Sequence, residues 1–170
     1  MVRFRRLCMA VGVLAALTVF TEPAWAQPSQ VTYSLAGVET AATSTEGTFV
    51  GVALAPDDFG TWGAVIDHDP LASPAPLVTG GAFAINGQVR DVQGVITGGT
   101  ITRLGGSCRK ETFAVTGGVA LVNGAGVPTG GVGVFGVTLT HYGFRMPGGG
   151  CLTFFATVEG GITVTLPPSP

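Results

Sequence analysis

Alternation of apolar and polar residues is clearest near the end of the chain, between Leu152 and Leu166. The even positions read Leu, Phe, Ala, Val, Gly, Ile, Val, Leu, and the odd positions read Thr, Phe, Thr, Glu, Gly, Thr, Thr. Successive side chains of a β-strand point to opposite faces of the sheet, so a period of two indicates a strand with one buried face. We therefore predict an antiparallel strand here, with its even positions in the core.

The same alternation recurs upstream, and turn residues separate the alternating stretches at short intervals. Its apolar positions there include Tyr33, Leu35, Phe113, Val115, Val119 and Leu121. No stretch after the N-terminal region shows the pattern of an amphipathic helix, which indicates an all-β protein. The predicted strands lie near residues 31–38, 47–55, 61–67, 77–85, 88–104 (bent or bulged), 110–122, 131–145 and 151–166.

Two Asn-Gly pairs, Asn86-Gly87 and Asn123-Gly124, fall between predicted strands. Asn-Gly readily takes the positive φ angles of a type I′ turn, so both are predicted to form tight hairpins. The segment from Asp69 to Pro76 is rich in proline and is predicted to be an irregular loop.

Glycines recur inside the predicted strands, most visibly in Thr-Gly-Gly triplets at 79–81, 97–99, 116–118 and 129–131. Glycine inside a strand marks a bulge, a bend or a close backbone approach, as a sheet that curls closed requires. We therefore predict one antiparallel domain of about eight strands that forms a meander β-barrel, with a β-sandwich as the alternative. In architecture this resembles the small secreted barrels of dirigent and allene-oxide-cyclase type, which by itself implies no function.

The first 26 residues have the order of a secretory signal peptide. Arg3, Arg5 and Arg6 precede an apolar run over 7–20, and Ala24-Trp25-Ala26 has the form of a cleavage site. The apolar run is too short to span a hydrocarbon core of about 30 Å comfortably. We predict a signal peptide over 1–26, a barrel domain over 27–166 and a flexible proline-rich tail over 167–170, in a secreted or periplasmic protein with no membrane span after cleavage.

Charge is sparse in the predicted mature chain. Removing residues 1–26 takes three arginines and one glutamate from the eight basic and ten acidic residues of the full chain, which leaves five basic and nine acidic residues and a formal net charge of −4. No run of Lys and Arg favours nucleic acid or an anionic membrane surface as a partner. A transmembrane β-barrel is a further alternative, although the aromatic residues form no evident pair of girdles.

Two cysteines, Cys108 and Cys151, remain after cleavage. In an oxidising compartment such a pair indicates a disulfide. Closing a loop of about 43 residues stabilises the fold by about 4 kcal/mol in the chain-entropy model. The two cysteines lie in turns at the same end of the meander, two strands apart, so the bond requires the turns to lean together.

Few residues suggest chemistry. His141 and Arg145 extend the apolar odd face of strand 131–145, next to Tyr142, and Trp62 is the only tryptophan after the signal peptide. We take His141, Tyr142, Arg145 and Trp62 as candidate ligand-binding residues, although each also fits an ordinary place at a strand end or in a core. Asp67-His68-Asp69 is dense in polar groups, but three consecutive strand residues cannot all face one ion, so no metal site is predicted.

No motif of a hydrolase, a zinc enzyme or a phosphate-binding loop is present in the sequence. The interpretation is a non-catalytic secreted barrel that binds a small apolar ligand or a surface partner and needs no cofactor. One alternative is a cofactor-free barrel enzyme of cyclase or isomerase type, and another is a self-associating envelope or matrix protein. These readings differ in whether the barrel interior is open or packed, which alternation alone does not decide.

The exported protein is expected to have the mass of residues 27–170 less two hydrogens, because the signal peptide is removed and the cysteines are joined. Native mass spectrometry of the protein recovered from the exported fraction tests both the removal of the signal peptide and the formation of the disulfide. A mass that includes residues 1–26, or that carries two free thiols, contradicts the corresponding prediction.

Overall fold

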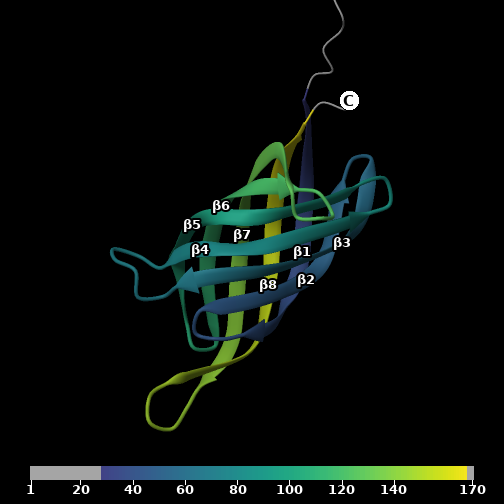
Figure 1. Cartoon of the computed structure of the whole chain (residues 1–170). Helices are drawn as coiled ribbons and strands as arrows, with labels where there is room; N and C mark the ends of the chain where they lie inside the picture. Colours follow the sequence, from purple (N-terminus) through teal and green to yellow (C-terminus); the bar gives the residue numbers. More distant parts are fainter. Residues whose placement is uncertain (1–27, 168–170) are drawn as a thin grey trace, which may run out of the picture.

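Eight antiparallel strands close into a barrel with simple meander order in the computed structural model, which describes residues 28–167 (Figure 1). They are β1 (Ser29–Ala42), β2 (Glu46–Ala55), β3 (Asp58–Asp69), β4 (Leu77–Gly87), β5 (Asp91–Ser107), β6 (Lys110–Val122), β7 (Pro128–Arg145) and β8 (Cys151–Leu166). Each strand pairs with the next along the chain, and β8 returns to pair with β1. The predicted all-β barrel is confirmed, while the predicted signal peptide and most of the C-terminal tail lie outside the described residues.

Each strand overlaps its predicted range, although β1 continues to Ala42 instead of ending at residue 38, and the residues between β3 and β4 form the predicted proline-rich loop. The predicted bend in β5 is also present, because its pairing with β6 shifts register between Ile96 and Gly98 and again between Arg103 and Gly105. Gly98 has a φ of 135°, a conformation that other residues rarely adopt. Within residues 28–167 no helix is long and apolar enough to cross a membrane.

The barrel interior is packed with apolar side chains from all eight strands. Buried core residues are Tyr33, Leu35, Phe49, Ala53, Trp62, Val78, Ile85, Val92, Ile96, Val115, Val119, Leu121, Val158, Ile162 and Val164. Inward glycines make room for large rings: a Cβ on Gly117 would lie 2.6 Å from the ring of Phe135, and one on Gly94 would lie 2.5 Å from the ring of Phe83. The cavity left among these side chains is only about 50 Å³. An apolar interior is the reverse of the polar lumen of transmembrane barrels.

Both Asn-Gly pairs lie at chain reversals, but the predicted type I′ turn is wrong at each, since neither Asn nor Gly has a positive φ there. After β6 the loop is wider: the Asn123 side-chain oxygen accepts hydrogen bonds from the backbone N–H groups of Ala125 and Val127, and Gly126 takes the left-handed conformation. After β4, Asn86 still pairs with Asp91, and the reversal spans the residues between them. Side-chain hydrogen bonds to the loop backbone thus replace the tighter turn.

The hairpin between β7 and β8 projects beyond the barrel (Figure 1). Pairing of β1 with β8 begins at Thr157, and pairing of β6 with β7 reaches only Tyr142, so β7 and β8 continue past that point as a two-stranded ribbon. A register shift between Tyr142 and Gly143 marks the exit. The sequence pattern placed Leu152 and Phe154 on the buried face of β8, and this is wrong, because the barrel ends before them and both are exposed.

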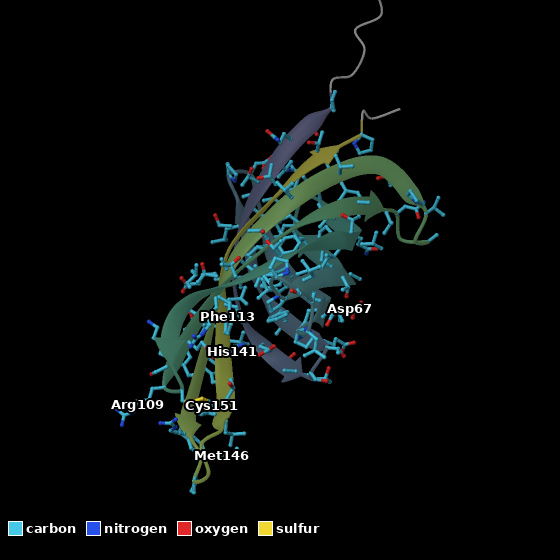
Figure 2. All side chains as sticks on the ribbon, turned by 90° about the vertical axis from the view of Figure 1, so that its left-hand side faces the viewer. Asp67, Arg109, Phe113, His141, Met146 and Cys151 are labelled. Atoms are coloured by element: carbon cyan, nitrogen blue, oxygen red, sulfur yellow. A yellow bond between two sulfur atoms is a disulfide. The ribbon has the colours of Figure 1, made fainter. Side chains whose placement is uncertain are left out.

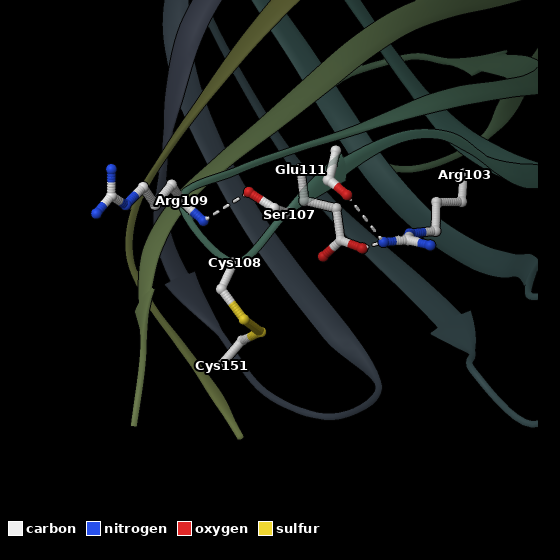
Figure 3. The surroundings of a disulfide bond; sticks show 7 residues. Arg103, Ser107, Cys108, Arg109, Glu111 and Cys151 are labelled. Carbon is white, nitrogen blue, oxygen red and sulfur yellow. Dashed lines mark hydrogen bonds and ion pairs between the residues drawn. A yellow bond between two sulfur atoms is a disulfide. The ribbon is translucent and has the colours of Figure 1, made fainter. Parts of the chain in front are cut away.

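The predicted disulfide between Cys108 and Cys151 is present and ties the turn between β5 and β6 to this hairpin (Figure 3). The Cα atoms of the two cysteines lie 5.3 Å apart. Gly143 lies between the two segments, and a Cβ there would come within 2.9 Å of the carbonyl oxygen of Cys108. The absence of a side chain at Gly143 therefore lets the turn lean onto the hairpin.

The opposite end of the barrel, where the described chain begins and ends, is held by a buried carboxylate. Asp58 accepts hydrogen bonds from the hydroxyl of Tyr33 and from the backbone N–H of Val89, each 2.9 Å long. The bond from Val89 is the main cause that lowers the pKa of Asp58. Burial and the adjacent carboxylate raise the pKa of Tyr33 to about 12. Asp58 thereby joins β1 to the loop that follows β4.

Replacing Tyr33 with Phe is expected to lower the free energy of unfolding at pH 7 by roughly 1.5–3 kcal/mol, the usual contribution of a hydrogen bond to a charged group. Because the pKa of Tyr33 is raised on folding, the contribution of Tyr33 to the free energy of unfolding is fully present below pH 10. This contribution is lost as the pH rises from 10 towards 12. Urea unfolding across this pH range measures both effects. Tyr142→Phe, at a half-buried position away from Asp58, is the control. If the wild type and Tyr33→Phe lose the same free energy of unfolding as the pH rises from 10 towards 12, the prediction is contradicted.

Candidate functional site

A pocket of about 240 Å³ opens at the barrel end from which the hairpin projects. This mouth pocket lies where β1, β3, β5 and β7 end, and Figure 2 shows His141 and Phe113 above the disulfide end of the molecule. Its lining residues are mostly apolar: Ala42, Gly47, Phe49, Ile66, Pro70, Pro76, Ile101, Phe113, Val115 and Leu139, with Glu39, Thr43, Glu46, His68 and His141 as the polar groups. Four of them, Phe49, Ile66, Val115 and Leu139, also line the small interior cavity, so the packed core forms the floor of the pocket.

Glu39 and His141 face each other at this mouth from different parts of the barrel wall. Glu39 continues the inward face of β1 after Tyr33 and Leu35, and His141 continues the inward face of β7 after Leu139. The Nε2 atom of His141 lies 3.6 Å from Oε2 of Glu39, which is too long for a hydrogen bond. The side chains are 13% exposed at Glu39 and 26% exposed at His141. Nε2 itself is buried and has no hydrogen-bond partner.

Burial moves the two pKa values in opposite directions. Desolvation raises the pKa of the Glu39 carboxyl. It lowers the pKa of His141, an effect that the negative charge of Glu111 partly opposes. Both changes favour the neutral forms, a carboxylic acid and an uncharged imidazole, because an apolar surrounding penalises charge. The ring of Phe113, 5.4 Å from the imidazole centroid, forms part of that surrounding.

This arrangement offers one hydrogen-bonding position in an apolar pocket. A buried polar atom without a partner is costly, by about 1–3 kcal/mol, so a molecule that bonds to Nε2 gains that energy on binding. Two facing titratable groups whose pKa values approach each other also form a pair between which a proton can move. Among residues 28–167 no cluster of His, Cys, Asp and Glu is arranged to hold a metal ion.

The four candidate ligand-binding residues do not converge on one place. His141 lies in the mouth pocket. Trp62 lies deeper, where it lines the small interior cavity and its indole N–H donates a hydrogen bond of 3.2 Å to the carbonyl of Ala36. Tyr142 packs against Phe155, with the ring centroids 6.0 Å apart. Arg145 lies beyond the register shift in β7, beside the disulfide, in a hollow that also includes Cys108 and Arg109.

Asp67, His68 and Asp69 form the end of β3, as an ordinary strand end would. Only His68 of the three lines the mouth pocket, and its backbone N–H donates to the carbonyl of Thr45. The Asp69 carboxylate accepts a hydrogen bond from the N–H of Leu71 and so starts the proline-rich loop.

Glu39 is the residue of this candidate site that the sequence analysis did not identify. The first predicted strand ended at residue 38, whereas β1 continues to Ala42. The signal was present, because Tyr33, Leu35, Gly37 and Glu39 share one parity and an acid on an apolar face is a notable exception. Its pairing with His141 was not visible, since the two residues meet only across the closed barrel.

In comparisons with known proteins, no protein-family model, no curated protein and no solved structure matched this chain.

The imidazole of His141 is expected to titrate with a midpoint below its ordinary value of 6.5, because burial penalises the cation. Glu111→Gln should lower the midpoint further, since it removes the negative charge that favours the cation. As the pH falls below 6.5 the unfolded chain takes up a proton that the folded chain does not, so this group costs stability on acidification. Proton NMR of the imidazole ring, assigned with a His68→Gln variant, measures the midpoint; a value of 6.5 or above contradicts the prediction.

Proposed function

We propose that the protein is an exported, non-catalytic binding protein whose barrel mouth holds a small, mostly apolar molecule with one hydrogen-bonding group. The observation that carries the proposal is the buried Nε2 of His141, which has no hydrogen-bond partner, in a mostly apolar pocket. Sites for small molecules commonly combine apolar walls with a few convergent polar groups. The N-terminal sequence pattern supports export, and the disulfide is compatible with an oxidising compartment.

The pocket dimensions limit the size of the ligand. At about 240 Å³ the pocket lies just below the range of roughly 300–1,000 Å³ typical of sites for drug-sized ligands. In the packed core beneath the pocket, the ring of Phe135 occupies the space beside Gly117. No deep channel therefore remains for a ligand with a long hydrocarbon chain. A single-ring or short-chain compound fits this description better than a fatty acid.

A second candidate function is cofactor-free proton transfer, which the opposed pKa changes of Glu39 and His141 favour. In that case the Glu39 carboxylate removes a proton from the carbon next to a bound carbonyl group, and the N–H of His141 donates a hydrogen bond to the carbonyl oxygen. Return of that proton from Glu39 to the oxygen of the resulting enolate completes a keto–enol isomerisation, and its return to the carbon regenerates the carbonyl compound. Self-association through sheet edges has less support, because the closed barrel has no free edge outside the hairpin.

Binding of toluene, benzyl alcohol and acetophenone, measured by chemical-shift perturbation, tests the ligand proposal. Benzyl alcohol and acetophenone should bind about fivefold more tightly than toluene, because one hydrogen bond contributes about 1 kcal/mol. His141→Phe should abolish this preference, whereas Tyr142→Phe, on the other side of β7, should keep it. Equal affinities for the three probes in the wild type, or no binding of any of them, overturns the proposal.

The same acetophenone sample in D₂O distinguishes binding from catalysis. Proton transfer at the pocket replaces the methyl hydrogens with deuterium, and Glu39→Gln should slow this exchange to the rate without protein. Tight binding without accelerated exchange supports the binding function alone.

A further inference from the structure

The projecting hairpin carries a cluster of exposed apolar side chains that the barrel does not use. Phe154 is 69% exposed and Phe144 49% exposed, and Leu152, Phe155 and Met146 are also exposed. Phe144 pairs with Leu152 across the ribbon, and its ring centroid lies 6.5 Å from that of Phe154. Tyr142 and Phe155 form a second aromatic pair at the base. Contiguous exposed apolar side chains on a soluble fold commonly mark an interaction surface.

The same end of the molecule collects most of the positive charge. Arg103, Arg109 and Arg145 line one hollow beside the disulfide, and Figure 3 shows Arg103 and Arg109 near it. Lys110 is the register partner of Tyr142. These four residues are spread over more than forty positions in the sequence and form no basic run. Folding and the disulfide bring them together around the hairpin.

Charge is therefore divided unevenly along the molecule. Of the five basic and nine acidic residues within 28–167, the hairpin and the adjoining ends of β5 and β6 carry four basic residues and one acid, Glu111, for a formal charge of +3; Glu39, Glu46, Asp67 and Asp69 lie at the same end of the barrel, on β1, β2 and β3. The remainder of the barrel has one basic residue, Arg90, and eight acids, for a formal charge of −7. Arg90 is already paired with Asp57 at 2.6 Å. An anionic surface thus attracts the hairpin and the adjoining ends of β5 and β6, and it repels the rest of the barrel.

We propose that the hairpin from Tyr142 to Phe155 docks the protein on the surface of an anionic lipid bilayer. Aromatic side chains favour the interfacial region of a bilayer, and Lys and Arg are attracted to anionic headgroups. The hairpin combines both on an element that projects past the barrel rim and can reach a flat surface first (Figure 1). The charge complementarity selects an anionic bilayer in preference to a neutral one.

The disulfide gives the hairpin the rigidity that this role requires. A two-stranded ribbon is marginally stable alone, and here neither β1 nor β6 supports it beyond its base. The bond from Cys151 to Cys108 anchors it to the turn after β5, which also holds Arg109. Docking also brings the mouth pocket towards the bilayer, since both lie at the same end of the barrel.

Flotation with lipid vesicles tests the proposal, using phosphatidylcholine with 30 mol% phosphatidylglycerol and pure phosphatidylcholine as the two surfaces. The wild-type protein should bind the anionic vesicles at least tenfold more tightly than the neutral ones at low salt, and 0.5 M NaCl should largely remove the difference. Arg109→Glu with Arg145→Glu should reduce anionic binding at least tenfold. Phe144→Ser with Phe154→Ser should also reduce it, at both salt concentrations.

Val134→Ser is the matched control, because Val134 is an exposed apolar residue on β7 outside the hairpin, and it should bind as the wild type does. All proteins are compared in the same processed form, and circular dichroism checks that each is folded. Equal binding to both vesicle types, no binding to either, or retention of binding by both hairpin variants overturns the proposal. A dimer that the hairpin variants dissociate, without vesicle binding, assigns the surface to a second copy and also overturns it.

Discussion

Closure of the barrel by pairing of β8 with β1 is the constraint on which the other features depend. An eight-stranded sheet that closes on itself has two separate surfaces, and the inner one must be filled by side chains of matched size. Rings such as Phe135 and Phe83 fill it only because glycines face them, at Gly117 and Gly94. Closure also places the two ends of the barrel in different chemical settings, one with the buried, hydrogen-bonded carboxylate of Asp58 and one with the mouth pocket.

Because the core is packed, the mostly apolar pocket that contains His141 lies at the barrel mouth and not in the interior. The strands there extend past the last core residues, so inward positions such as Glu39 and His141 are half-buried in apolar surroundings. In that setting desolvation raises the pKa of the carboxyl and lowers the pKa of the imidazole, so it favours the uncharged form of each group. The geometry of the barrel wall, rather than any local motif, thus gives this site its chemical character.

Strand periodicity predicted most of the fold. Alternation at Tyr33 and Leu35, at Phe113 and Val115, and along β8 identified strands and their buried faces, because the period of two is a property of the backbone itself. It failed at Leu152 and Phe154, where alternation continues although the partner strand has ended. Turn type also failed at Asn123, whose side chain bonds to the loop backbone instead of forming the tight turn.

The sequence by itself determined the fold class, the number of strands and the pairing of Cys108 with Cys151, since these depend on local periodicity, composition and the presence of two cysteines after residue 26. Only the tertiary structure decided that the interior is packed, that Glu39 faces His141, and that four separated cations surround an aromatic hairpin. These features depend on register and on where each strand loses its partner. Both are set by the closure of the whole sheet, which no local segment encodes.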